Sequence, residues 1–534
     1  MILDLAEVGT RPPHDCDVLL IGAGTCGLLL ADSLRSEGWR VVVLESGGLS
    51  ANERVQALNE VEQGGSRHYR GATEGRARVL GGTSSLWGGA LLPFQPHDLE
   101  PRPHLGLPGW PMAHGDVADW IPSLERAFAL PPGGYGADWL DAAIRRQDGI
   151  EDDETFETRF AKWPAFARRN TSRLFEERMR NDAGLVICLH ATADCLQPTD
   201  GDGSRVRGAV CIGPDGQRHT VLARRTIVCA GAIESTRLLL ASARAELARR
   251  LQPLTWLGRG FHDHLSMHVA ELRPPDPVAL NRLAGFRFHG SAMRSHRLEL
   301  TAQAQRSGAL PSAWAHIGFE GTSPGGFDAL RRIMQSLQRR RRPALSDAGA
   351  LLADAPYIAR VTAWRLFRRQ LLWPRQARYL VTVVGEQLPR AENAIYLSER
   401  RNALGQQLPR IDWSIDHQDL ETLRQAALRL GQYWQRHAAA SLGSMHWLLP
   451  LDRPFDARQL DLSDIYHPGG TTRMSSSAQD GVVDADLAVH GIDGLHVLST
   501  SVFPTGASAN PTMTLLLLAL RLARHLGQTL AQPD

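Results

Sequence analysis

Residues 17–46 read DVLLIGAGTCGLLLADSLRSEGWRVVVLES, and this stretch decides the fold. An apolar run, a glycine turn, a helical stretch and a second apolar run follow one another, which predicts a strand–helix–strand unit. Gly22 allows a tight turn, Gly24 lets a pyrophosphate approach the backbone, and Gly27 lets the helix pack closely on the strand. The helix N-terminus adds positive potential for phosphate groups. The stretch therefore predicts a Rossmann-like α/β domain that binds a dinucleotide.

Glu45 ends the second apolar run, about 20 residues beyond the glycine turn, where a carboxylate accepts hydrogen bonds from an adenosine ribose. A carboxylate there repels a 2'-phosphate, so NADP is disfavoured. No second glycine fingerprint for a nicotinamide cofactor is visible in the sequence. The simpler alternative is a glycine-rich turn that holds no ligand.

The bulk composition indicates a globular protein of two interlocked domains. The chain has 534 residues, 43% of them hydrophobic, and a net charge of +2, so no global field favours nucleic acid. Six cysteines without a C-x-x-C pair argue against a zinc site or a disulfide framework. The N-terminus lacks a secretory pattern and predicts a cytoplasmic protein. The longest apolar run, Leu515–Leu520, is too short to span a bilayer and predicts a buried helix.

The chain ends and the middle differ in composition, and this predicts the domain division. Residues 14–264 form the dinucleotide domain, with a Pro-rich helical cap over 93–132. The loop RVLGGTSSLWGGALL reads as extended and irregular, and CAGAIESTRLLLAS (229–242) as a strand, a turn and a helix. Residues 265–450 are expected to form a second, sheet-based α+β domain that binds the substrate, and residues 451–534 return to the first domain.

Within the second domain, residues 331–380 are rich in arginine and also carry Trp364, Phe367 and Trp373. Such a stretch could lie on a membrane surface or form a lid. A solvated helical face is the commoner outcome, and all three interpretations stay open.

The C-terminal block carries the chemistry. His467 opens HPGGTTRM, and Asn510 opens NPTMT. An imidazole can take a hydroxyl proton at neutral pH, and an amide can hold the same hydroxyl oxygen without competing for the proton. Pro511 suits the first turn of a helix, whose N-terminal dipole would stabilise negative charge on a reduced cofactor. Taken alone, a His before Pro-Gly-Gly is more often a loop residue. Together with the dinucleotide turn, the pair predicts the oxidation of an alcohol, with His467 as the base.

These motifs resemble the glucose-methanol-choline oxidoreductases, flavoproteins that oxidise alcohols. The resemblance covers the chain ends, including GAGTCG with Glu45, RVLGGTSSLWGG, CAGAIESTRLLLAS, LGRGFHDH and HPGGTTRM, and it is loose over about 270–440. It implies an extended FAD, a small-molecule alcohol substrate, and oxygen or another electron acceptor. The cofactor-binding residues that it implies are Gly22, Gly24, Gly27, Glu45, Gly82, Ser84, Ser85, Trp87, Ala193, Ser499, Pro511 and Thr512.

The sequence departs from the family pattern at two places. Many members have Asn or His at the position of Trp87, and a branch with a similar Trp often has a flavin-linking His directly before it. Leu86 stands there in this chain, so FAD is expected to bind without a covalent bond. Ser475 replaces a usual Gly after TTRM and is expected to shift only a turn. The FHDH segment around Asp263 looks metal-like, but the family segment is structural, so no metal is expected.

The NPT motif at residues 510–512 and Trp87 favour relatives that oxidise carbohydrates, such as pyranose oxidases and the sugar-alcohol oxidases of aminoglycoside pathways. We therefore expect an FAD-dependent oxidase or dehydrogenase that converts a hydroxyl of a sugar-like or polyol substrate to an aldehyde or ketone. The alternatives are a non-sugar alcohol (aliphatic, sterol or amino alcohol) as substrate, or an FAD-binding protein without catalysis.

Overall fold

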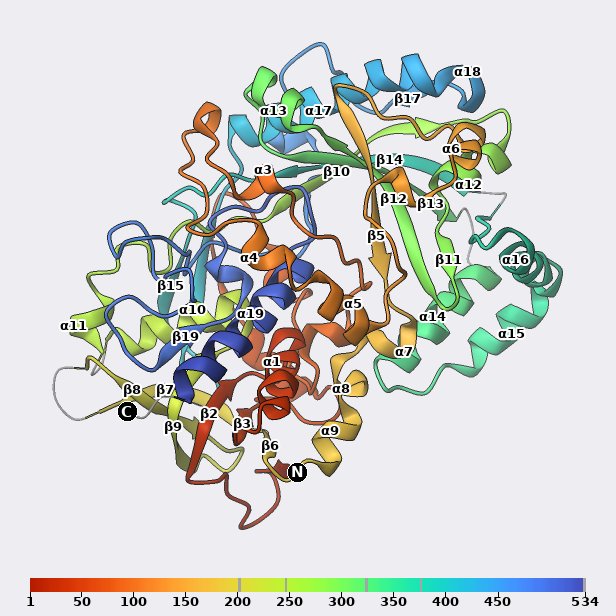
Figure 1. Cartoon of the computed structure of the whole chain (residues 1–534). Coiled ribbons are helices and arrows are strands. Elements are labelled where there is room, and N and C mark those ends of the chain that lie inside the picture. Colours follow the sequence, from red (N-terminus) through yellow and green to blue (C-terminus); the bar gives the residue numbers. More distant parts are fainter. Residues whose placement is uncertain (200–202, 245–246, 322–324, 375–376, 532–534) are drawn as a thin grey trace.

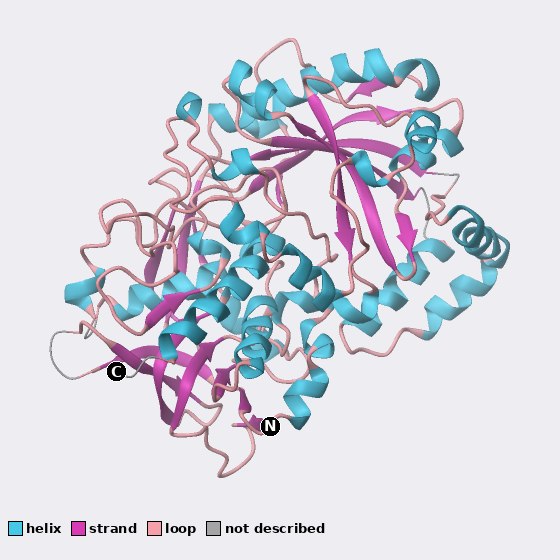
Figure 2. Ribbon diagram, viewed as in Figure 1, coloured by secondary structure: helices cyan, strands magenta, loops and turns pink. Residues whose placement is uncertain are grey.

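The computed structural model describes residues 1–199, 203–244, 247–321, 325–374 and 377–531. Two large sheets dominate it, one at the lower left of Figure 1 and one at the upper right, and helices cover both (Figure 2). Each sheet has its own hydrophobic core. This confirms the predicted α/β class, with a Rossmann-like sheet and a second sheet.

The first sheet contains the predicted strand–helix–strand unit. Strand β2 (Asp15–Ile21) leads through helix α1 (Thr25–Ser36) to β3 (Val41–Leu44), which pairs parallel with β2. The apolar residues of both strands are buried, as expected for central parallel strands covered on both faces. The strand order is β1-β6-β3-β2-β9-β8-β7, with β19 paired to β9. The remaining strands are β1 (Ile2–Asp4), β6 (Leu185–Leu189), β7 (Thr192–Pro198), β8 (Val206–Ile212), β9 (Arg218–Val228) and β19 (Leu495–Val497).

The strand order reverses at β2, and this creates the place where α/β sheets bind ligands. From β2 the chain runs outward through β3 and β6, and it then returns to the other side of β2 as β9. Helix α10 (Gly231–Ser242) follows β9 through the predicted tight turn. The turns after β2 and β9 therefore lie side by side at the carboxyl edge of the sheet, which is a topological switch point.

Two further helical regions cover the first sheet. Helix α19 (Thr512–Leu530) packs against α1 and buries the run Leu515–Leu518, which confirms the predicted buried helix. The Pro-rich cap forms α3 (Pro96–Leu99), α4 (Gly115–Ala118) and α5 (Ile121–Phe128). None of the described helices is long and apolar enough to cross a membrane.

The loop that was predicted as irregular differs slightly from the expectation. Residues Gly82–Ser85 form one turn of 3-10 helix, here called η3. The turn is stabilised because the Ser84 and Ser85 hydroxyls donate to the carbonyl oxygens of Gly81 and Gly82. Serine hydroxyls favour such local bonds, a signal present in the sequence.

The second sheet is antiparallel and has the order β11-β12-β13-β14-β10-β17, with β5 also paired to β12 and β18 to β10. Helix α17 (His417–His437) covers it with an apolar face. Strand β5 joins this sheet although it precedes residue 264 in sequence. The strands are β5 (Phe156–Trp163), β10 (His264–Leu272), β11 (Arg287–His289), β12 (Ala292–Leu300), β13 (Ala313–Gly321), β14 (Ala377–Glu386), β17 (Met445–Trp447) and β18 (Ser463–Asp464). A small third sheet joins β15 (Ala394–Arg401), β16 (Gln407–Trp413) and β4 (Glu62–Gly65).

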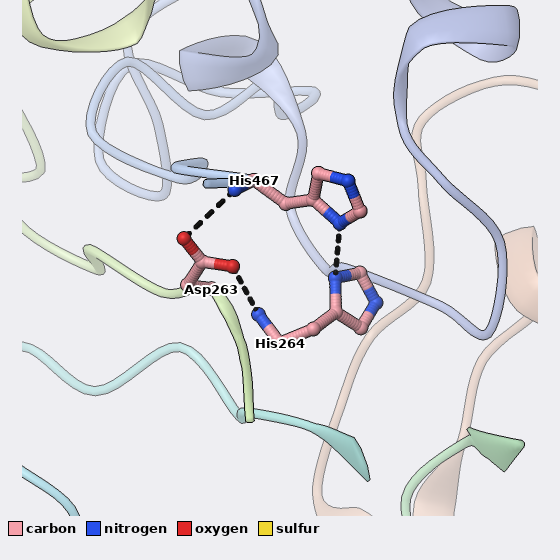
Figure 3. A group of neighbouring side chains, drawn as sticks. All are labelled: Asp263, His264 and His467. Atoms are coloured by element: carbon pink, nitrogen blue, oxygen red, sulfur yellow. Dashed lines mark hydrogen bonds between the residues drawn. The ribbon is translucent and has the colours of Figure 1, made fainter. Parts of the chain in front are cut away.

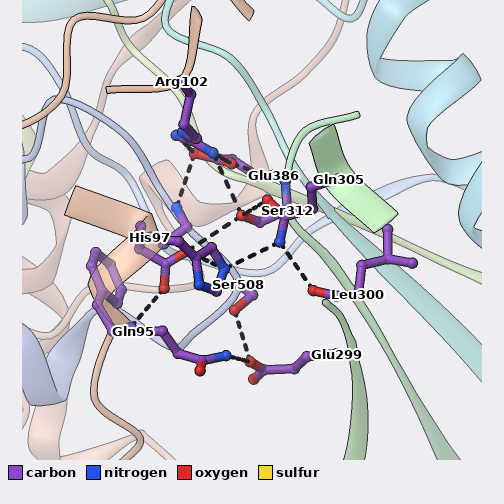
Figure 4. Close-up of polar contacts among 12 residues, drawn as sticks. Gln95, His97, Arg102, Glu299, Leu300, Gln305, Ser312, Glu386 and Ser508 are labelled. Atoms are coloured by element: carbon purple, nitrogen blue, oxygen red, sulfur yellow. Dashed lines mark hydrogen bonds and ion pairs between the residues drawn. The ribbon is translucent and has the colours of Figure 1, made fainter. Parts of the chain in front are cut away.

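A buried polar network connects the cap, the second sheet and the C-terminal loop (Figure 4). The Arg102 guanidinium donates to both oxygens of Glu386, at 2.6 and 2.8 Å. Glu386 also accepts the backbone amides of Ser312 and Ala507, at 3.1 and 2.9 Å. Burial opposes ionisation, but Arg102 outweighs it and lowers the pKa of Glu386 to about 2. Removing the carboxylate would leave a buried arginine without its partner.

We therefore expect Glu386→Ala to lower the free energy of unfolding by about 3–5 kcal/mol, the range seen when one partner of a buried pair is removed. Glu60→Ala is the matched control because its ion pair with Arg400 is exposed, and it should cost less than about 1 kcal/mol. Chemical denaturation followed by circular dichroism measures both. Equal losses in the two variants would contradict the assignment.

Candidate active site

The glycine turn after β2 is built by two close backbone approaches. Gly22 has φ +113°, and a Cβ there would lie 2.6 Å from the carbonyl oxygen of Cys229. A Cβ on Gly27 would lie 2.1 Å from the carbonyl oxygen of Gly22. A Cβ on Gly24 would meet no described atom within 4 Å. The first and third glycines therefore serve packing, whereas the second faces open space.

The start of α1 offers hydrogen-bond donors to that space. The backbone amides of residues 24–27 have no acceptor among the described residues, and the first turn carries no acidic side chain. Such a helix start, with its positive dipole end, suits a phosphate group. The turn thus fits the pyrophosphate of a dinucleotide.

Glu45 is buried directly below this turn. Its two carboxylate oxygens accept the backbone amides of Ala23 and Gly47, at 2.9 and 2.8 Å. Burial, only partly offset by these bonds, raises its pKa. The backbone amide of Ala191 donates to the Glu45 carbonyl oxygen at 2.8 Å, and this places the start of β7, with Ala193, beside Glu45. Glu45 therefore braces the turn, and its contact with a ribose stays a prediction.

The loop that contains η3 lies against the glycine turn. The amide of Gly81 donates to the Ala23 carbonyl oxygen at 2.9 Å, and a Cβ on Gly82 would lie 2.8 Å from Gly24 Cα. The Ser84 hydroxyl also contacts that of Thr171, at 2.9 Å. Because the hydroxyls of Ser84 and Ser85 already donate to protein carbonyls, this loop would offer a cofactor mainly its backbone.

Two more predicted residues border the same edge. The indole N–H of Trp87 donates to the Arg169 carbonyl oxygen at 2.8 Å. Ser499 follows β19 and is fully buried, and the neighbouring Leu498 carbonyl oxygen accepts from the Cys26 thiol of α1 at 3.4 Å. The glycine turn, η3 and Ser499 thus lie close together, and their contact with a cofactor stays a prediction.

The predicted catalytic pair is brought together by two distant segments. Asn510 precedes α19, which begins at Thr512 with Pro511 as its N-cap. The Asn510 amide nitrogen lies 3.3 Å from His467 Nε2, and the Asn510 oxygen accepts from Arg297 at 3.3 Å. Because that oxygen faces a guanidinium, the amide nitrogen faces His467 and donates to it.

A third residue completes the array, and the sequence alone did not predict it. His264 Nδ1 lies 3.2 Å from His467 Nδ1, with the two rings nearly perpendicular (Figure 3). His264 Nε2 lies 2.8 Å from the Ala507 carbonyl oxygen, which can only accept. His264 therefore carries its proton on Nε2 and accepts at Nδ1. His467 must then donate from Nδ1, and its Nε2 keeps a lone pair.

Burial and nearby positive charge keep both imidazoles neutral. Burial lowers the pKa of His264 to about 4. Burial, then His264 and Arg297, hold the pKa of His467 well below its usual range. Arg297 is buried and pairs with Glu299, whose pKa the arginines Arg297 and Arg159 lower to about 2 against the effect of burial. His467 is consequently an unprotonated acceptor at neutral pH.

Asp263 holds the two histidine backbones in place. Its carboxylate accepts the amides of His264 and His467, at 2.6 and 2.8 Å, and the Tyr69 hydroxyl. Burial, then the carboxylate of Asp464, raises its pKa to about 8. Asp263, His264 and His467 could geometrically hold a metal ion, since one ligand atom from each lies within 4.8 Å of the others. The hydrogen bonds account for the cluster without an ion, and the expected absence of a metal stays a prediction.

The sequence missed His264 and Arg297 for different reasons. The FHDH segment was visible but was interpreted only as structural, and it does dock on HPGG through the amides of His262 and Gly469. Arg297 lies in β12 and carries no local motif. Its position beside Asn510 follows from the packing of the second sheet against the C-terminal loop.

A Rossmann-like fold that also holds a neutral histidine in contact with an amide indicates the class of protein: an oxidoreductase. Residues 389–519 match the family model of the GMC oxidoreductases. This match covers the C-terminal part of the chain, and the chain is an oxidoreductase of the kind that acts on CH–OH groups.

Similar proteins span almost the whole chain. The 6'''-hydroxyparomomycin C oxidase of Streptomyces lividus is 23% identical, over 96% of this chain and 92% of its own length. The oxygen-dependent choline dehydrogenase of Cronobacter sakazakii is also 23% identical, over 96% and 95%. Among solved structures, pyridoxine 4-oxidase from Mesorbium loti has a TM-score of 0.58 and 18% identity, over 96% of this chain and 99% of its own. A variant of Aspergillus oryzae RIB40 formate oxidase, made to follow the modification of its FAD, has a TM-score of 0.57 and 17% identity, over 97% and 99%.

The GMC match and the FAD-containing structural neighbours support FAD as the cofactor, and the residues present fit it. The open space beside Gly24 and the α1 amides would take the pyrophosphate, and the α19 start beside Asn510 would lie at the flavin end.

The glycine turn yields a direct test, because Gly24→Ala meets no protein atom but enters the open space. We expect the variant to fold normally and to bind FAD at least about tenfold more weakly, as one lost close phosphate contact is typically worth more than 1.4 kcal/mol. Titration of the apoprotein with FAD measures this. Gly115→Ala is the matched control, since a Cβ there also meets no described atom and Gly115, like Gly24, has no positive φ. Unchanged affinity in Gly24→Ala would show that the pyrophosphate lies elsewhere.

Proposed function

We propose that this GMC oxidoreductase oxidises a hydroxyl of a sugar-like or polyol substrate to an aldehyde or ketone, with His467 as the base. The module around the first sheet, residues 14–264 and 451–534, would hold FAD, and the second sheet, within 265–450, would bind the substrate. Bound FAD would accept the hydride from the alcohol carbon. Oxygen or another acceptor would then take the electrons.

The observation that carries this proposal is the proton arrangement along His264 and His467. The Ala507 carbonyl oxygen fixes the proton of His264, and His264 in turn fixes the proton of His467 on Nδ1. His467 Nε2 is thereby left as the unprotonated nitrogen, and it faces the Asn510 amide. A general base must have its lone pair aimed at the proton it removes, and this array provides it.

Asn510 serves the same hydroxyl in our proposal. In the absence of substrate its amide nitrogen contacts His467 Nε2 at 3.3 Å. A substrate hydroxyl inserted between them would donate to His467 and accept from Asn510. Arg297 fixes the amide orientation, and the start of α19 directs its dipole toward negative charge on the cofactor ring.

We also propose that FAD is held without a covalent bond. Leu86, which stands where some relatives have a linking histidine, has a half-exposed aliphatic side chain and no atom that could form the bond. Acid precipitation should then leave all flavin in the supernatant, and flavin in the pellet would refute this.

The substrate class rests on sequence similarity to an oxidase of 6'''-hydroxyparomomycin C, together with Trp87 in the η3 loop. Relatives also include choline dehydrogenases and a 2-methyl-1,2-propanediol dehydrogenase, so an amino alcohol or aliphatic alcohol is the alternative. Anaerobic mixing with a panel of sugars, aminoglycosides, aliphatic alcohols, amino alcohols and sterols distinguishes them. Bleaching of the flavin by sugars or aminoglycosides supports the proposal, and bleaching by the other alcohols alone overturns it.

His467→Ala should bind FAD normally and reduce it with substrate at least about 100-fold more slowly, since general-base assistance is typically worth two to four powers of ten. Asn510→Ala should have a smaller effect. The two losses should not multiply in the double variant, because both groups act on one hydroxyl. Stopped-flow absorbance measures flavin reduction, and a rate near wild type in His467→Ala would remove this residue from the mechanism.

The pH dependence tests the charge that Arg297 places beside His467. In the wild type the pKa of His467 lies well below the usual histidine value of about 6.5. The rate of flavin reduction should therefore stay constant from pH 8 to below pH 6.5. Arg297→Met removes the positive charge, which should raise this pKa and move the acid limb of the profile to higher pH. Unchanged flavin content is the control, and the melting temperature should fall because Glu299 loses a buried partner. A profile that stays the same, or moves to lower pH, would contradict the assignment.

A further inference from the structure

The arginine-rich stretch forms three helices at the outer edge of the molecule, to the right in Figure 1. They are α14 (Gly326–Gln338), α15 (Leu345–Ala353) and α16 (Ala355–Arg368). Residues 325–370 contain ten arginines against three aspartates, although the whole chain has a net charge of only +2. All ten arginines are exposed, and Asp347 is buried and paired with Arg332. Positive charge is therefore concentrated on this one surface.

The same helices expose large apolar side chains. Leu345 is 93% exposed, Phe367 84%, Leu352 78% and Leu366 72%. Among the described large hydrophobic residues only Val8 is more exposed. Single exposed apolar residues are ordinary, but four in two consecutive helices need an explanation.

The helical periodicity gathers these side chains on faces turned to solvent. On α15, Leu345 and Leu352 are seven residues apart and share a face, with the buried Asp347 on the opposite side. On α16, Ala359, Ala363, Leu366 and Phe367 follow the spacing i, i+4, i+7, i+8, and Val361 is buried on the other side. Both helices thus have an apolar face that no described residue covers.

The surface is firmly anchored to the rest of the enzyme. The Gln338 amide at the end of α14 donates to the carbonyl oxygens of Ser84 and Trp87, at 3.1 and 2.9 Å. The Asn170 amide donates to the Gln338 carbonyl oxygen at 3.0 Å. On α16, the Tyr357 hydroxyl donates to the Leu372 carbonyl oxygen at 3.1 Å. These contacts tie α14 to the η3 loop and α16 to the chain segment that follows it.

We propose that α14–α16 bind the surface of an anionic lipid bilayer. Leu345, Leu352 and Phe367 would enter the boundary between headgroups and acyl chains, and the arginines would contact lipid phosphates. An apolar helical face bordered by cations is the pattern of interfacial helices. A second copy of this chain is disfavoured as the occupant because two arginine-rich surfaces would repel each other.

The test uses the full-length holoenzyme and sedimentation with vesicles of phosphatidylcholine, alone or mixed with phosphatidylglycerol. We expect binding to the anionic vesicles at least about tenfold tighter than to the neutral ones, and weaker binding as salt screens the arginines. Leu345→Ser, Leu352→Ser and Phe367→Ser combined should weaken binding at least about tenfold, because the apolar anchors are lost. Val8→Ser with Leu49→Ser is the matched control, since these residues are exposed elsewhere.

A second variant separates charge from apolar contact. Arg339, Arg341 and Arg342 form no ion pair with described residues, so changing all three to Gln should reduce the preference for anionic vesicles without loss of stability. Flavin content and alcohol oxidation should be unchanged in both variants. Wild-type protein that does not bind anionic vesicles, or a serine variant that binds as well as wild type, would overturn the proposal. Light scattering that shows a dimer split by the serine changes would also overturn it, since the surface would then join two copies.

Discussion

The buried carboxylate of Glu386 is the constraint on which the site geometry depends. Arg102 keeps it ionised, and one of its oxygens accepts the backbone amide of Ala507. Ala507 has φ +56°, a conformation that a residue with a Cβ rarely adopts, and the hydrogen bond helps to hold it there. The carbonyl oxygen of the same residue then fixes the proton of His264. An ion pair at the cap thus determines which nitrogen of His467 is free.

The glycine turn and the C-terminal loop around Asn510 are held in place by different kinds of contact. At the cofactor edge the contacts are between backbones, because Gly22, Gly27 and Gly82 leave no room for side chains. At the catalytic loop they are charged: Arg297 reaches from β12 to the Asn510 amide and to the Ser508 carbonyl oxygen at 2.7 Å. Close backbone packing thus shapes the glycine turn, and burial together with the charge of Arg297 keeps His467 neutral.

The sequence was sufficient wherever a local pattern carried the information. The glycine spacing predicted β2, α1 and β3, and the proline in NPT predicted a helix start, which the structure places at Thr512 with Pro511 as the N-cap. It was insufficient where pairing is non-local. Strand β5 joins the second sheet through β12, about 140 residues later, and nothing in its own sequence specifies that partner. His264 and Arg297 reach the site through the same long-range packing, and no spacing rule connects them to His467.

The η3 loop is the element that joins the site to the arginine-rich helices. The carbonyl oxygens of Ser84 and Trp87 accept hydrogen bonds from the Gln338 side chain of α14. On its other side the loop contacts the glycine turn through the Gly81 amide, which donates to the Ala23 carbonyl oxygen. The Gln338 side-chain amide satisfies these two carbonyl oxygens. The loop therefore cannot move without breaking hydrogen bonds to α14. A surface held by α14–α16 would therefore be fixed in orientation relative to the cofactor edge. The helices that the sequence left as solvated face, lid or membrane contact are thus bonded through α14 to the loop that packs on the glycine turn.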